Sequence, residues 1–312
     1  MTVHLVSVGV SLTDSLRNPR DSLKGHGELI RPVLDHEPHM LLESRGIRTG
    51  EAASDWIAGA LAGVASERAC GSAAELTDLC AQLRPGLWPS DISAELDTFK
   101  LASGSGARVS GRDVAVLISS DTGAGLVAGL WNAVALTGGH LKRVSFLAEP
   151  DQLAGDVRGQ VVLVRVPGLD AGDAAGFSKA MAGLGTLGRE LCAMAGSDEP
   201  FRFYLSGGFK AAIPYLIGLA EGIRSLNPER KVDAFVLHET TKSAVIRLPL
   251  RRLVGEWVTD ELEQFDRTGA GKPASPALLE GYAYEKDGRT WRLTPFGFGL
   301  RALFSRPRGH GG

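Results

Sequence analysis

The residues with the clearest capacity for chemistry form the segment 206–215, Ser-Gly-Gly-Phe-Lys-Ala-Ala-Ile-Pro-Tyr. Apolar and aromatic residues 201–205 before it predict a buried strand, and apolar residues at helical spacing after it predict a helix. Pro214 suits the first helical turn, where an N–H group is not needed. A turn from a strand into a helix offers free backbone N–H groups and the positive end of the helix dipole. Lys210 adds a full positive charge, so this segment predicts a site for phosphate or another oxyanion.

Two further strand ends are rich in hydroxyl groups and glycine. A short strand over residues 3–10 leads into 7–13, and the apolar run 113–120 leads into 119–125. Ligands of open α/β sheets gather beyond the carboxyl ends of the strands. Serine and glycine alone would be explained by good turns, but three such loops together with a lysine favour a real site that wraps phosphates.

A dinucleotide site is the rival interpretation of the second loop. Residues 123–128 match G-x-G-x-x-A after a strand, and Glu149 closes the next strand as a ribose ligand would. In that fingerprint, however, the glycines lie in the tight turn itself, whereas residues 119–122 intervene here. A P-loop motif is absent from the sequence, which disfavours a Walker-type ATPase.

Helices and strands alternate along most of the chain. An apolar stripe at steps of three and four from Phe177 to Met194 indicates a core helix, and Ser93 is a capping residue for another. The alternation predicts an α/β fold with a mainly parallel sheet and helices on both faces. Further helices are expected over 51–65, 73–83, 93–101 and 123–136, and further strands over 143–147, 160–166, 234–238 and 244–248.

The composition changes after Pro249, which predicts one domain over 1–250 and a smaller one over 251–312. In the second we expect an amphipathic helix within 253–265, a linker-like turn over 269–275, a two-stranded wing over 282–293 turning at Asp287-Gly288, and a last short helix from Thr294. Ten Lys/Arg residues stand against eight Asp/Glu in this region, a weak balance for a DNA-binding domain.

The overall composition indicates a globular protein without a general affinity for nucleic acid. Of 312 residues, 44% are hydrophobic, and the formal net charge is −2. The sequence shows neither a signal peptide nor a long apolar run, so a cytoplasmic location is expected. The three cysteines are expected to be plain thiols, and His26, His36 and His39 lack the spacing of metal ligands. We therefore expect no metal and no cofactor.

Segments 117–125 and 206–215 resemble those of the CRISPR-associated Rossmann fold (CARF) proteins, in particular a group with a Gly-Gly-Phe-Lys loop. Ser93-Ala-Glu-Leu and the hairpin over 237–249 also match the pattern of that group. The resemblance covers roughly residues 1–250. It implies a Rossmann-like domain and a homodimer whose shared pocket binds a cyclic oligoadenylate, most often the tetramer. Two-fold symmetry suits such a ring, because each protomer can hold half of it.

Effectors of this kind carry a nuclease domain, and neither of its usual motifs is found after residue 250. A CARF domain followed by a small winged-helix domain is similar instead to the stand-alone ring nucleases of type III CRISPR systems. The resemblance then implies metal-independent cleavage of cyclic tetra-adenylate to linear diadenylate with 2′,3′-cyclic phosphate ends, which switches off antiviral signalling. The serine and lysine used by that group fall on Ser11 and Lys210.

The implied chemistry needs few groups, because the ribose 2′-OH is already tethered beside the phosphate that it attacks. Lys210 and nearby N–H groups would stabilise charge on the phosphate oxygens, and Ser11 would orient the phosphate or the ribose hydroxyl. A histidine base is not evident, which predicts slow turnover. The other expected ligand-binding residues are Gly9, Val10, Ser119, Ser120, Asp121, Thr122, Gly123, Ser206, Gly207, Gly208 and Phe209.

The alternative is a protein that binds the ring without cleaving it. Lys210 would then be a binding contact only. The protein would be a sensor, or a CARF/winged-helix transcription regulator whose C-terminal domain could contact DNA through arginines such as Arg289, Arg292 and Arg301.

Overall fold

The computed structural model describes residues 1–17, 49–68, 71–88, 92–104, 106, 108–153, 155–170, 173–238 and 244–305. The three histidines at 26, 36 and 39, Cys70 and the turn at 239–243 lie outside the described residues.

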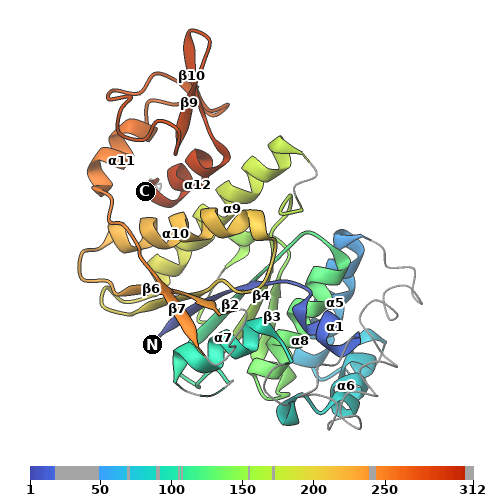
Figure 1. Ribbon diagram of the computed structural model, residues 1–312. Helices are drawn as coiled ribbons and strands as arrows, with labels where there is room; N and C mark the ends of the chain where they lie inside the picture. The colour runs from blue at the N-terminus through green and yellow to red at the C-terminus, as the bar shows by residue number, and fades with distance from the viewer. Residues whose placement is uncertain are drawn as a thin grey trace, which may run out of the picture.

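A seven-stranded sheet in the order β3-β4-β2-β1-β5-β6-β7 forms the centre of the protein (Figure 1). Every pairing is parallel except that of β6 with β7, so the expected α/β fold with a mainly parallel sheet is confirmed, and it is compatible with a Rossmann-like fold. The strands are β1 (Val3–Val8), β2 (Val114–Ser119), β3 (Val144–Leu147), β4 (Val161–Arg165), β5 (Phe201–Tyr204), β6 (Val232–Leu237) and β7 (Val245–Leu248).

Strand β1 lies at the middle of the sheet, and all its residues are buried. Successive apolar side chains point to opposite faces, so Leu5 belongs to one core cluster and Val6 to the other. Val8 is paired with Ser119 of β2, and Val6 with Tyr204 of β5. The carboxyl ends of β2, β1 and β5 therefore meet at one edge of the sheet, as the argument from the three loops requires.

Helices cover both faces of the sheet (Figure 1). The expected core stripe is confirmed in α9, where Met181, Leu184, Leu187 and Leu191 are buried. One face carries α1 (Ser11–Arg17), α5 (Gly50–Ala65), α6 (Ser72–Leu83), α7 (Ala94–Ser103) and α8 (Gly123–Leu136). The other face carries α9 (Ala174–Met194) and α10 (Ile213–Leu226), and α11 (Gly255–Leu262) and α12 (Pro295–Phe304) pack on these two helices.

One expectation for the C-terminal region needs correction. The segment 269–275 is not a plain linker, because it contains β8 (Ala270–Gly271), which pairs with β10 (Thr290–Leu293). The expected wing is present as β9 (Tyr284–Asp287) and β10, turning at Gly288, whose φ is 61°. A DNA-binding winged helix also needs a helix-turn-helix pair before the wing. Residues 263–283, between α11 and β9, hold no second helix.

The C-terminal region packs on the helices of the sheet. Leu300 and Leu303 of α12 belong to the same core cluster as Leu184 of α9. The two helices approach so closely that a Cβ on Gly185 would overlap with the backbone of Gly299. The division of the chain at residue 250 stays a prediction.

A buried carboxylate fixes the start of this region. Glu221 of α10 is 2% exposed and accepts hydrogen bonds from the Arg251 backbone N at 3.0 Å, from Arg251 Nε at 2.9 Å and from the Tyr282 hydroxyl at 2.9 Å. Burial alone would raise the pKa of Glu221, but these donors outweigh it and hold the pKa below the ordinary value. Within the described residues, no helix is long and apolar enough to cross a membrane.

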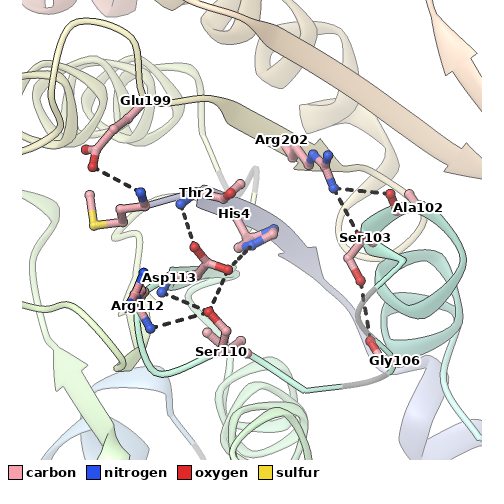
Figure 2. A network of polar contacts seen from close by, with 12 residues as sticks. Thr2, His4, Ala102, Ser103, Gly106, Ser110, Arg112, Asp113, Glu199 and Arg202 are labelled. Carbon is pink, nitrogen blue, oxygen red and sulfur yellow. Dashed lines mark hydrogen bonds and ion pairs between the residues drawn. The ribbon is translucent and has the colours of Figure 1, made fainter.

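A second polar network lies toward the amino ends of the central strands (Figure 2). His4 of β1 shares a hydrogen bond of 2.8 Å with the Tyr204 hydroxyl, and its Nε2 lies 3.8 Å from Asp113 Oδ2. Asp113 also accepts from the Thr2 backbone N at 2.6 Å and from the Ser110 hydroxyl at 2.8 Å. Burial lowers the pKa of His4 to about 4, although Asp113 opposes this shift.

We expect His4 to make the protein less stable at mildly acidic pH. His4 becomes protonated near pH 6.5 in the unfolded chain, but only near pH 4 in the folded chain. The free energy of unfolding should therefore fall by about 3 kcal/mol across this interval from His4 alone. Urea denaturation at several pH values measures it. His4→Gln should flatten this part of the profile, whereas His140→Gln, at an exposed site, should not; identical profiles for the two variants would contradict the assignment.

Candidate functional site

The loops after β1 and β5 touch each other at the carboxyl edge of the sheet. A Cβ on Gly9 would lie 2.5 Å from the backbone N of Gly208, so only glycine allows this approach. Gly208 itself has a φ of 90°, a conformation that glycine adopts readily. The Ser7 hydroxyl strengthens the junction by donating to the Gly207 carbonyl at 2.7 Å. The structure thus brings together two of the three loops chosen from the sequence.

Glu95, in the first turn of α7, joins these two loops, and sequence reasoning missed it. Ser93 caps the helix as expected, since its hydroxyl accepts from the Leu96 N–H at 3.2 Å. Glu95 is 1% exposed; it accepts from Gly9 N at 2.9 Å, from the Ser93 hydroxyl at 2.7 Å and from the Ser11 hydroxyl. On its other side the carboxylate lies against Gly207, where any Cβ would overlap with it. The available signal was the segment Ser93-Ala-Glu-Leu, which predicts a capped helix start but not a buried carboxylate.

Ser11 is the first residue of α1, and not part of a longer loop as the sequence indicated, because β1 ends at Val8. Its hydroxyl donates to Glu95 and accepts from the Ala94 N–H at 3.1 Å. The preceding Val10 is 41% exposed.

Lys210 begins the short 3-10 helix η4 (Lys210–Ala212), which leads directly into α10. Its side chain is exposed, and no carboxylate among the described residues pairs with it. Pro214 lies in the first turn of α10, as expected. Phe209 is the residue before η4, and its N–H and that of Gly208 donate to no described residue. These N–H groups and the ammonium group form the positive side of the candidate site.

The Ser206 hydroxyl is used inside the protein. It accepts from the Thr98 hydroxyl at 2.6 Å and from the Leu237 N–H at 2.7 Å. Ser206 therefore ties the turn after β5 to α7 and to the end of β6. This role positions the loop that carries Lys210.

The third loop, after β2, is largely occupied by its own hydrogen bonds. Ser119 is 0% exposed, and Thr122 caps α8 by accepting from Gly125 N at 3.1 Å. The Ser120 hydroxyl lies 3.0 Å from that of Thr122. Asp121 pairs with Arg165 Nε at 2.6 Å and accepts from Gly168 N at 3.1 Å. The carboxylate of Asp121 is thus turned toward the end of β4, and Arg165 is a neighbour that the sequence did not indicate.

The dinucleotide interpretation of this loop does not fit the topology. Strand β4 lies between β2 and β3, so Glu149 follows a strand about 10 Å from β2. Glu149 caps the short helix η3 (Pro150–Gln152) instead. A Cβ on Gly125 would overlap with the Ser120 hydroxyl, so this glycine makes room for the loop and not for a pyrophosphate.

The arrangement can bind an anion, and the described residues contain no group of three His, Cys, Asp or Glu that could hold a metal ion. Cys80 and Cys192 are free thiols, and burial raises the pKa of each to about 11, which makes them unreactive at neutral pH. Comparison with models of protein families and with curated proteins gave no match for this chain.

We expect Gly207→Ala to damage the site more than an ordinary glycine substitution. The new methyl group would overlap with the buried Glu95 carboxylate, so the loop after β5 must move, at a cost of about 1–3 kcal/mol. Gly111→Ala is the matched control, because a Cβ there meets nothing within 4 Å. Thermal denaturation compares the two. Equal melting temperatures would contradict the close packing of Gly207 on Glu95.

Proposed function

We propose that this protein is a metal-independent ring nuclease that cleaves cyclic tetra-adenylate to linear diadenylate with 2′,3′-cyclic phosphate ends. The observation that carries the proposal is the contact at the carboxyl edge of the sheet between Gly9 and Gly208, in the two loops that lead to Ser11 and Lys210. This is the edge at which α/β proteins bind ligands. The family resemblance of segments 117–125 and 206–215 supplies the substrate and the reaction, which would end antiviral signalling in the cytoplasm.

The loop after β5 would bind the phosphate, and the segment after β1 would bind the ribose. The free N–H groups of Gly208 and Phe209, with Lys210, would hold the scissile phosphate and stabilise its transition state. Ser11, on the other loop, would orient the reacting ribose. The 2′-OH then attacks its own 3′-phosphate in line, and the bond from phosphorus to the next ribose 5′-oxygen breaks. Because the nucleophile is part of the substrate, positioning accounts for most of the rate.

A homodimer fits a ring of four identical nucleotides, since each protomer would hold half of the ring around a two-fold axis.

The second candidate is a sensor that binds the ring without cleaving it. It is favoured by the hydrogen bonds of Ser11, whose hydroxyl is engaged by Glu95 and Ala94 within the protein. A sensor that regulates transcription by binding DNA is less well supported than a sensor that does not, because residues 263–283 contain no second helix for a helix-turn-helix.

Incubation of the purified protein with cyclic tetra-adenylate in EDTA, resolved by chromatography, tests the proposal. The wild type should convert the ring to linear diadenylate. Lys210→Ala should slow the reaction about a hundredfold or more, because the variant lacks the ammonium group that stabilises negative charge on the phosphate in the transition state. Lys231→Ala is the matched control, an exposed lysine just before β6 at the amino edge of the sheet.

An intact ring that is still bound would leave the sensor and refute the nuclease. Loss of activity in the Lys231→Ala control as well would mean that general positive charge, and not the position of Lys210, accounts for the effect.

A further inference from the structure

The hydrogen bonds of Ser11 leave it only one way to meet a ligand. A serine hydroxyl has one proton to donate and two lone pairs. The proton of Ser11 is directed to Glu95, and one lone pair receives the Ala94 N–H at 3.1 Å. One lone pair remains for the site. Ser11 can therefore accept a hydrogen bond from a ligand hydroxyl, but it has no proton left for a phosphate oxygen.

Glu95 enforces this orientation because the three described groups that hydrogen-bond to its carboxylate are all donors. Gly9 offers a backbone N–H at 2.9 Å, which cannot reverse its role. The hydroxyls of Ser11 and Ser93 both point to the other oxygen, Oε2. At 1% exposure, the carboxylate has no room for water to replace these donors.

The hydrogen-bond network of Glu95, Ser93 and Asn132 has one more acceptor than it has protons, so it can take up one further proton. The Ser93 hydroxyl lies 2.7 Å from Glu95 Oε2 and 2.9 Å from Asn132 Oδ1, two acceptors for a single proton. The amide of Asn132 is held in this orientation, because its Nδ2 donates to the Ala128 carbonyl at 2.9 Å. If Glu95 takes a proton on Oε2, Ser93 can accept from it and turn its own proton to Asn132. While Ser93 donates to an ionised Glu95, Asn132 Oδ1 lacks a proton from Ser93; the protonated state supplies this missing hydrogen bond, and the two states differ by one proton.

We propose that Glu95 acts through Ser11 as the proton acceptor of the ring cleavage, and that it makes Ser11 a receptor for the ribose 2′-OH. This inference rests on the proposed function. As the 2′-oxygen bonds to phosphorus, its proton passes to Ser11, and the proton of Ser11 passes to Glu95. The bond from phosphorus to the 5′-oxygen breaks, and that oxygen takes a proton from solvent. Glu95 returns its proton to solvent after product release.

Glu95→Gln provides a sharp test because it reverses the polarity of Ser11. The amide oxygen must face the fixed N–H of Gly9, so the amide NH₂ faces Ser11 and turns its proton toward the site. Binding of cyclic tetra-adenylate and of its all-2′-deoxy analogue is measured by calorimetry, and cleavage of the former by single-turnover kinetics. The wild type should bind the ribose ring about tenfold more tightly than the deoxy ring, and Glu95→Gln should lose this preference.

The variant should also cleave about a hundredfold more slowly while still binding the ring, because the proton acceptor is lost. Glu95→Asp, which keeps the carboxylate, should recover part of the rate. Glu229→Gln, at an exposed site between α10 and β6, is the control and should match the wild type. Thermal denaturation of each variant establishes that it is folded.

The outcomes separate this inference from the proposed function. A wild type that neither binds nor cleaves the ring overturns both. A wild type that cleaves, together with a Glu95→Gln variant that keeps its rate and its preference for the ribose ring, overturns the role of Glu95 alone. An equal loss of rate and affinity, without recovery in Glu95→Asp, would reduce Glu95 to a structural residue and also overturn it.

Discussion

The contact of two strand-end loops around one buried carboxylate is the constraint on which the candidate site depends. An ionised carboxylate without partners is very costly to bury, so Glu95 is tolerated only because Gly9, Ser11 and Ser93 all donate to it. These donors come from the β1 loop, from α1 and from the cap of α7. Because Gly207 has no Cβ, the Glu95 carboxylate can also pack directly against the loop after β5. A shift of any of these segments would remove one of the hydrogen bonds that stabilise the buried charge.

The sheet makes this convergence possible. Strand β1 is central, with β2 and β5 as its neighbours, although β5 follows it by almost two hundred residues in the chain (Figure 1). Helix α7 crosses the face near β1, and the Ser206 hydroxyl links α7, β5 and β6. The site is therefore placed by contacts between segments far apart in the sequence, which are rigid because the strands beneath them are buried on both faces.

The sequence was sufficient for features that follow from local pattern. The bounds of α8 agree with the expected 123–136, a run of small and apolar residues after a strand. The apolar stripe of α9 lies in the core, as its helical periodicity predicts. The order of the strands could not be predicted from the sequence. Because β4 lies between β2 and β3, Glu149 at the end of β3 is not next to the loop after β2. Asp121 could not be assigned to Arg165 for the same reason, and Glu95 in a first helical turn has the pattern of an ordinary exposed acid. Each of these depends on a partner distant in the chain.

The candidate site has two sides of opposite polarity, and this narrows what it can recognise. On the β5 side, Lys210 and free N–H groups require an acceptor such as a phosphate oxygen. On the β1 side, the remaining lone pair of Ser11 requires a donor, and the negative Glu95 behind it repels a second phosphate. A simple anion satisfies only the first side. A ribonucleotide linkage satisfies both, because its 2′-OH and its 3′-phosphate lie on adjacent carbons, and a deoxynucleotide lacks the donor. The polarity of the site therefore agrees with the proposed ribonucleotide ligand on grounds separate from the family resemblance.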